Sequence, residues 1–219
     1  SGAHHTNYFF PDLAGVGISY NTYVWNEKMD PGAGMLRLVF GLGTRAVNRV
    51  EGDYPRMVAL DDPLRRPYAE KDDLRKFSQH EVDLIDIRGN TFQTIPFEKL
   101  VSEKSYIDID RIAVKDDEAM RMMSGTGAEE KEYWILTLDS IFDDSTLAGS
   151  FKKILESLEE SYHYPIEIEF TVNFTKDNKF KINLLQCRPL QTGGQGRKVE
   201  IPDRIDNEDI LFESHGYFL

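Results

Sequence analysis

The sequence of 219 residues is poor in three features, and each scarcity excludes a class of protein. Its single cysteine, Cys187, excludes an internal disulfide framework and fits a reducing cytosol. No apolar run approaches the ~20 residues that a membrane-spanning helix needs, so no membrane partner is expected. Positive charge is also scarce, since 26 Lys and Arg residues against 38 Asp and Glu residues give a formal net charge of −12. This charge disfavours a nucleic-acid backbone as a partner. We therefore expect an acidic, cytoplasmic protein.

The rest of the composition is that of a folded chain. Hydrophobic residues make up 40% and aromatic residues 11%, which is enough for one domain with a substantial core or for two small lobes. The five histidines are scattered, and no pair has metal-ligand spacing with a third partner, so a zinc site is not expected. The chain begins at Ser1 rather than Met, and we expect it to be a piece of a larger protein.

The stretch from Tyr164 to Thr192 predicts a β-hairpin. In PIEIEFTVN, apolar and polar side chains alternate with period 2, which is typical of a strand with one apolar face. A polar loop over residues 175–179 follows, and residues 180–185 predict the returning strand, before Pro189 stops it.

This hairpin brings three polar side chains onto neighbouring strands: Glu169 on the first, and Gln186 and Arg188 on the second. A carboxylate and an amide oxygen are hard ligands of the kind that Mg²⁺ prefers, and a guanidinium makes a two-pronged contact with phosphate. Together they suit the phosphate chain of a nucleotide. From the pattern alone, solvent-facing residues of an ordinary hairpin are the alternative.

Three stretches resemble motifs of the phosphoenolpyruvate synthase and pyruvate phosphate dikinase family, and they follow one another along the chain in the family's order. PIEIEF…LLQCRPLQT is similar to the (D/E)IE(F/W)…LLQxRP signature that closes the family's nucleotide site. GMLRLVFGLGTRAVNRVEGDYPRMVAL, residues 34–60, is similar to the family's strand and GLG loop. FPDLAGVGISYN, residues 10–21, resembles the SGVAFT strand region. The resemblance covers most of the chain, from about residue 8 to residue 192.

The resemblance implies an α+β fold, an ATP-grasp-like lobe with a mainly antiparallel sheet and flanking helices. This partial nucleotide-binding domain is expected over residues 1–192, with an inserted subregion at about residues 61–132. Residues 193–219 are expected to form a linker and an acidic C-terminal tail. No match to the family's N-terminal lobe is found, so the resemblance indicates a fragment that is inactive alone.

As the resemblance implies, the full enzyme is a phosphotransferase that binds ATP with Mg²⁺. It passes a phosphoryl group to a His on a separate carrier domain and then to pyruvate on a further domain. Glu169 and Gln186 are then expected to hold Mg²⁺, and Arg188 to offset charge on the transferring phosphoryl group as the catalytic residue. The alternatives are a dikinase of the same fold with another acceptor, an antibiotic or a glucan, and a non-catalytic nucleotide-binding regulatory module.

The second motif adds candidate nucleotide contacts. Residues 35–40 predict a strand that ends at a glycine turn, and residues 44–50 predict a helix with Thr44 near its N-cap. Backbone N–H groups at such a turn can meet an anion, so Gly41 and Gly43 are candidate cofactor-binding residues. Arg45 and Arg49 lie either near phosphate or on a solvated helix face. Many relatives read GLGE here, and Thr44 departs from that pattern, so it is given no catalytic role.

The remaining segments predict elements without visible chemistry. Alternation predicts strands at 81–87, 91–95 and 107–114, and an apolar run predicts a buried strand at 133–138. Helices are predicted from Pro96 to Val101 and from Asp144 or Ser145 towards Tyr162. In the second helix, apolar residues recur at helical spacing and are expected to face the core.

Overall fold

The computed structural model describes residues 3–5, 7–67, 71–103, 108–124, 132–175, 177 and 179–191. The strands are β1 Ala3–His5, β2 Tyr8–Phe10, β3 Leu13–Ile18, β4 Met35–Val39, β5 Arg56–Ala59, β6 Glu81–Asp86, β7 Thr91–Pro96, β8 Ala113–Lys115, β9 Trp134–Leu136, β10 Ile166–Phe174 and β11 Phe180–Pro189. The helices are η1 Pro31–Ala33, α1 Thr44–Val47, α2 Lys71–Lys76, α3 Phe97–Ser102, α4 Ile109–Ile112, α5 Asp117–Ser124, η2 Ser140–Phe142 and α6 Thr146–Tyr162.

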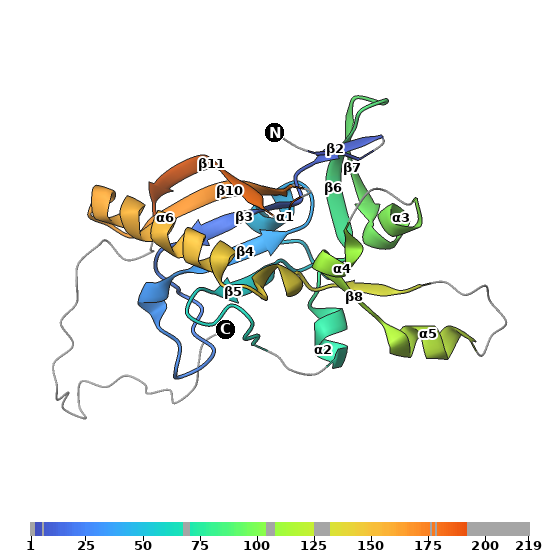
Figure 1. Cartoon of the computed structure of the whole chain (residues 1–219), viewed down its shortest axis with the longest axis horizontal. Coiled ribbons are helices and arrows are strands. Elements are labelled where there is room, and N and C mark those ends of the chain that lie inside the picture. The colour runs from blue at the N-terminus through green and yellow to red at the C-terminus, as the bar shows by residue number, and fades with distance from the viewer. Residues whose placement is uncertain are drawn as a thin grey trace.

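The larger sheet has five strands in the order β11-β10-β3-β4-β5, and all its neighbouring pairs are antiparallel. β10 shows the predicted alternation, because its apolar residues are buried and the polar residues between them are partly exposed. The long helix α6 lies along this sheet (Figure 1) and packs against its buried face. Phe151 of α6 meets Phe170 of β10 with ring centroids 4.2 Å apart. The apolar stripe of α6 therefore faces the core, as predicted.

A smaller sheet has four strands in the order β1-β2-β6-β7, again all antiparallel. A third sheet pairs only β8 with β9, also antiparallel. The chain leaves β2 through Pro11 and Asp12 and enters β3 of the larger sheet. The Asp12 carboxylate accepts the N–H of Phe174 at 2.7 Å, which ties this crossing to the end of β10. The stretch at residues 10–21, which resembles the SGVAFT strand region, thus contains the end of β2 in one sheet and all of β3 in the other.

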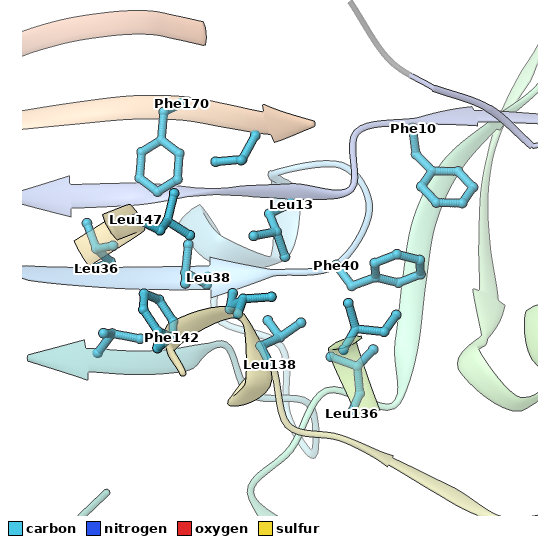
Figure 2. Close-up of a cluster of buried hydrophobic side chains, with 14 of the residues drawn as sticks. Phe10, Leu13, Leu36, Leu38, Phe40, Leu136, Leu138, Phe142, Leu147 and Phe170 are labelled. Carbon is cyan, nitrogen blue, oxygen red and sulfur yellow. The ribbon is translucent and has the colours of Figure 1, made fainter. Parts of the chain in front are cut away.

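One hydrophobic core joins the two sheets. The ring of Phe40, just after β4, lies edge-on to Phe10 at 5.3 Å and to Phe97 at 5.9 Å between centroids. Figure 2 shows Phe40 beside Phe10, with Leu136 and Leu138 close by. Val82 and Leu84 of β6 belong to the same core cluster. The β6–β7 hairpin, from the segment predicted as an insertion, is therefore packed into the core.

The strand predicted at residues 107–114 is wrong over most of its length. Residue 107 lies outside the described residues, α4 is a helical turn, and only the short β8 that follows is extended. Aspartates are poor strand formers, and this segment contains Asp108 and Asp110. The turn also buries Ile112, whose carbonyl accepts the N–H groups of Thr137 at 3.0 Å and Leu138 at 2.9 Å.

The helix predicted from Thr44 is shorter than expected. Gly43 is its N-cap, and α1 ends at Val47 because Asn48 is extended. By contrast, α6 begins and ends close to the predicted bounds. The Asp144 carboxylate accepts the N–H of Thr146 at 2.8 Å at the start of α6, and His163 ends the helix in the left-handed conformation.

The three sheets of the described residues are antiparallel and helices pack beside them, so the predicted α+β class with a mainly antiparallel sheet is confirmed. In the part of the chain that the structure describes, none of the helices has the length and apolar character that a membrane crossing requires.

Replacing Phe151 by Ala should test the packing of α6 on the sheet. The Phe151 side chain is fully buried, so the substitution is expected to lower the free energy of unfolding by about 3–5 kcal/mol. Urea unfolding measures this loss. Lys153→Ala, on the exposed side of the same helix, is the control and should change stability by less than about 0.5 kcal/mol. Equal losses in the two variants would contradict the packing.

Candidate functional site

The polar residues of the C-terminal hairpin lie in two consecutive cross-strand pairs. Glu169 of β10 lies directly opposite Gln186 of β11, and Glu167 lies opposite Arg188. Residues directly opposite each other share a face of the sheet, and so do residues two apart along a strand. The three predicted site residues Glu169, Gln186 and Arg188 are therefore brought together on one face, with Glu167 as a fourth member.

Arg188 is held by Glu167 rather than by Glu169. Its Nε donates to Oε1 of Glu167 at 2.9 Å, and its Nη2 donates to the same oxygen. This hydrogen bond is the main cause that raises the pKa of Arg188, with the charges of Glu167 and then Glu169 adding to it. The pair stays accessible to solvent, so the guanidinium is oriented but still able to contact a ligand.

A β-bulge follows the Glu169–Gln186 pair. Phe170 is opposite Leu184, so Leu185 is an extra residue without a partner on β10. A bulge redirects the side chains around it, and Leu185 lies exposed on the surface.

An open cleft of about 610 Å³ lies beside this bulge. Its lining comes from the β2–β3 crossing, the glycine turn with α1, β7, β10 and β11: Phe9, Pro11, Ala14, Gly15, Leu42, Gly43, Thr44, Val47, Asn48, Phe92, Glu169, Phe170, Thr171 and Leu185. Two residues predicted from separate motifs, Gly43 and Glu169, thus meet in one cleft. Gly41, Gln186 and Arg188 are not among the lining residues.

The cleft has an apolar rim that the sequence did not predict. Val47, Phe92 and Leu185 are exposed by 47%, 57% and 63%, and they line the cleft from three different elements. Such exposure is unusual for large apolar side chains that gather together. The only signal in the sequence is the pair Leu184–Leu185, which breaks the alternation of its strand.

Asp83 of β6 holds the glycine turn in place, and sequence patterns gave no indication of it. Its backbone carbonyl accepts the N–H of Leu42 at 2.8 Å. Its carboxylate, which is buried, accepts the hydroxyl of Thr44 and lies 3.2 Å from Nε of Arg45. Thr94 of β7 donates a further hydrogen bond to it at 2.6 Å.

The two glycines of the turn differ in what they do. Gly41 has a φ of +95°, and a Cβ placed there would lie 2.5 Å from Cγ1 of Val82 and 2.8 Å from the carbonyl oxygen of Asp83. Gly41 therefore allows the turn to approach β6. Gly43 has ordinary helical angles and faces the cleft, where the nearest contact of a Cβ would be Ala14 at 3.4 Å.

Arg45 matches neither alternative that the sequence left for it. Its guanidinium is buried and pairs with Asp53, with Glu81 at 2.9 Å and with Asp83. Burial acts to lower the pKa of Arg45, but the charges of Asp83 and Asp53 outweigh it and raise the pKa. Arg45 therefore keeps its positive charge, and its ion pairs join α1 to β6. Because the guanidinium is enclosed by these carboxylates, it is not available to contact a phosphate.

Residues 6–209 match the family described as pyruvate phosphate dikinase, AMP/ATP-binding domain. The chain belongs to this family. No curated protein matches the chain. The recognition made from the three motifs is thereby confirmed, and the chain carries an ATP-binding domain of a phosphotransferase family.

Within this family, the geometry gives a physical context for Thr44. The GLGE pattern that the resemblance implies has an acidic side chain at that position. Here the Thr44 hydroxyl donates to the carboxylate of Asp83, so an acidic group lies next to position 44 but comes from β6. That carboxylate is buried and also bonded to Arg45 and Thr94, so it holds the turn rather than lining the cleft.

Gly41→Ala should destabilise the protein more than Gly52→Ala. Both glycines have positive φ, +95° and +76°, but a Cβ at Gly52 would have nothing within 4 Å. Gly52→Ala therefore isolates the conformational cost, about 1–2 kcal/mol. Gly41→Ala adds the clash with Val82 and Asp83 and should cost at least about 1 kcal/mol more.

Urea unfolding of the two variants beside the wild type measures the difference. Equal losses of stability would show that the turn does not depend on its close approach to β6.

Proposed function

We propose that this chain is the ATP-binding part of a phosphotransferase of the phosphoenolpyruvate synthase or pyruvate phosphate dikinase type. One observation supports it above the others: Glu169 lies opposite Gln186, with Arg188 on the same face, at the edge of a cleft that the glycine turn also lines. Residues of all three motif stretches line this one cleft, because Pro11, Ala14 and Gly15 of the stretch at residues 10–21 also belong to its lining.

The residues present fit a magnesium ion. Among the described residues, no three His, Cys, Asp or Glu side chains gather in a way that could hold a metal on their own. Glu169 and Gln186 instead supply a carboxylate and an amide oxygen from a directly opposed pair. Mg²⁺ is usually held by one or two carboxylates together with substrate phosphates, and this donor set is of that kind. When bound, Mg²⁺ neutralises charge on the phosphates.

The protein's own residues then act by positioning and charge. Glu169 and Gln186 orient the phosphate end of ATP at the edge of the sheet. Arg188, oriented by Glu167, balances negative charge on the phosphoryl group that is transferred. Gly43 lets the backbone approach the ligand, and Gly41 gives the turn its shape. Val47, Phe92 and Leu185 offer an apolar surface to the base.

The rest of the reaction belongs to the same proposal. A phosphorylatable His domain takes the phosphoryl group from ATP, and a pyruvate-binding domain receives it in turn. A cytoplasmic location is supported by the single cysteine. The partial domain at residues 1–192 and the insertion at about 61–132 stay predictions, and residues 193–219 lie outside the described residues.

A non-catalytic nucleotide-binding module is the second candidate, and one observation favours it. Arg188 already has a carboxylate partner in Glu167, and the acidic residue of the GLGE pattern is replaced by Thr44. Phosphoryl transfer from β-labelled ATP to the intact protein separates the candidates. A dikinase that leaves AMP keeps the β-phosphoryl group for its acceptor, whereas a regulatory module binds ATP without becoming labelled. A same-fold dikinase with an antibiotic or glucan acceptor becomes labelled but does not pass the group to pyruvate.

Titration of the intact protein with Mg·ATP by calorimetry should show binding that weakens in Glu169→Ala and Arg188→Ala. Each variant removes a contact between charged groups worth about 1.5–3 kcal/mol, so about a tenfold to hundredfold loss of affinity is expected. The loss in Glu169→Ala should largely disappear when the metal is omitted. Lys153→Gln on α6 is the control for net charge. A folded wild-type protein that gives no binding would overturn the proposal.

Phe92→Ala should weaken binding of adenosine as well as of ATP. Stacking of a base on an aromatic side chain contributes about 1–3 kcal/mol, so both affinities should fall by about fivefold or more. Phe92 is exposed, so the melting temperature should change little. Competition with a fluorescent adenosine derivative measures both affinities, and an unchanged affinity for adenosine would remove Phe92 from the site.

A further inference from the structure

Arg37 of β4 lies in the same cross-strand row as the candidate site. Val16 of β3 is opposite Glu169 on one side and opposite Arg37 on the other, and Glu169 is in turn opposite Gln186. Residues directly opposite each other share a face, so Gln186, Glu169 and Arg37 stand on one side of the sheet. Two strand spacings of about 4.8 Å separate the backbones at Glu169 and Arg37. Val16 between them is buried, so the Glu169 and Arg37 side chains flank it closely enough for one phosphate chain to contact both.

The surroundings of Arg37 are unusual for a cation. Leu36 and Leu38 beside it in sequence are fully buried in the core, and Met35 and Val39 are fully buried on its own face. Arg37 is itself half-buried in the middle of β4, an interior strand of the sheet. Within the described ranges, no hydrogen bond or ion pair joins its guanidinium to another residue, whereas Arg45 and Arg56 are paired. A half-buried guanidinium in apolar surroundings is stabilised when an anion is bound beside it.

The charge of the predicted site also calls for another cation. Glu167, Glu169 and Arg188 together carry a charge of −1, and the guanidinium of Arg188 is already bonded to Glu167. A nucleoside triphosphate is itself strongly negative, so these three residues alone repel it in the absence of a metal. Arg37 brings the summed charge of these residues to zero, and no carboxylate among the described residues pairs with it.

We propose that Arg37 is a phosphate-binding residue of this site, placed across Val16 from Glu169. The guanidinium donates two N–H groups to one phosphate group of the nucleotide, which is the geometry that arginine favours with phosphate. This proposal rests on the proposed ATP-binding function. It adds a contact within the second motif stretch, residues 34–60, to which the resemblance gave no role. Because Arg37 contacts only phosphate in this proposal, its substitution should change the affinity for nucleotides and leave the affinity for nucleosides unchanged.

The test is the affinity of the intact protein for Mg·ATP and for adenosine in Arg37→Gln and Arg37→Lys. Arg37→Gln should weaken Mg·ATP about tenfold to a hundredfold and leave adenosine unchanged. Arg37→Lys keeps the charge but loses the paired N–H groups, so it should fall between Arg37→Gln and the wild type. Lys153→Gln removes the same charge from the exposed side of α6 and should leave both affinities unchanged.

Thermal unfolding of the same variants separates a structural role from a binding role. Arg37→Gln should unfold at the wild-type temperature or slightly higher, since Arg37 has no partner among the described residues, and Mg·ATP should protect it less than it protects the wild type. An Arg37→Gln protein that binds Mg·ATP like the wild type overturns this role of Arg37 while the proposed function stands. A wild-type protein that binds neither ligand overturns both, and equal weakening of ATP and adenosine assigns Arg37 a structural role.

Discussion

The antiparallel pairing of β10 with β3 on one side and β11 on the other is the constraint on which the candidate site depends. The pairing with β11 sets Glu169 against Gln186 and Glu167 against Arg188. The pairing with β3 sets Glu169 against Val16 and, through it, in line with Arg37. A slip of one residue in either pairing would turn the polar row into the core and bring Ile168 and Phe170 to the surface. The packing of Phe170 under α6 therefore fixes the chemistry of the opposite face.

The glycine turn shows how a second sheet contributes to the same site. β6 belongs to the smaller sheet, and its Asp83 receives hydrogen bonds from the turn through both its backbone and its side chain. Gln79, just before β6, extends this support, because its side-chain amide both donates to and accepts from the backbone of Phe40 at 2.8 Å. The wall of the cleft is therefore shaped by residues from a segment that carries no chemical motif of its own.

Arginines occur in two settings in this molecule, paired between elements of the fold and at the candidate site. Arg45, Arg56 and Arg66 lie among carboxylates and carbonyl groups, where they join elements distant in the sequence. Glu167 orients Arg188 at the surface, while Arg37 stands without a partner in the described part of the chain. In a chain with a net charge of −12, cations such as Arg188 and Arg37 would set where a polyphosphate binds under the proposed function.

The sequence by itself determined the elements whose signals are local. Alternation located β10, helical spacing located α6, and the order of three motifs indicated the family, because each depends only on neighbours along the chain. The sequence also predicted the candidate site residues of the hairpin, Glu169, Gln186 and Arg188, but not Glu167, which lies beside them. Only the tertiary structure decided that Gly43 and Glu169 share a cleft, that Asp83 holds Thr44, that Arg45 is buried and that residues 109–112 turn rather than extend. These outcomes depend on contacts between segments far apart in sequence, where burial and pairing override local preference.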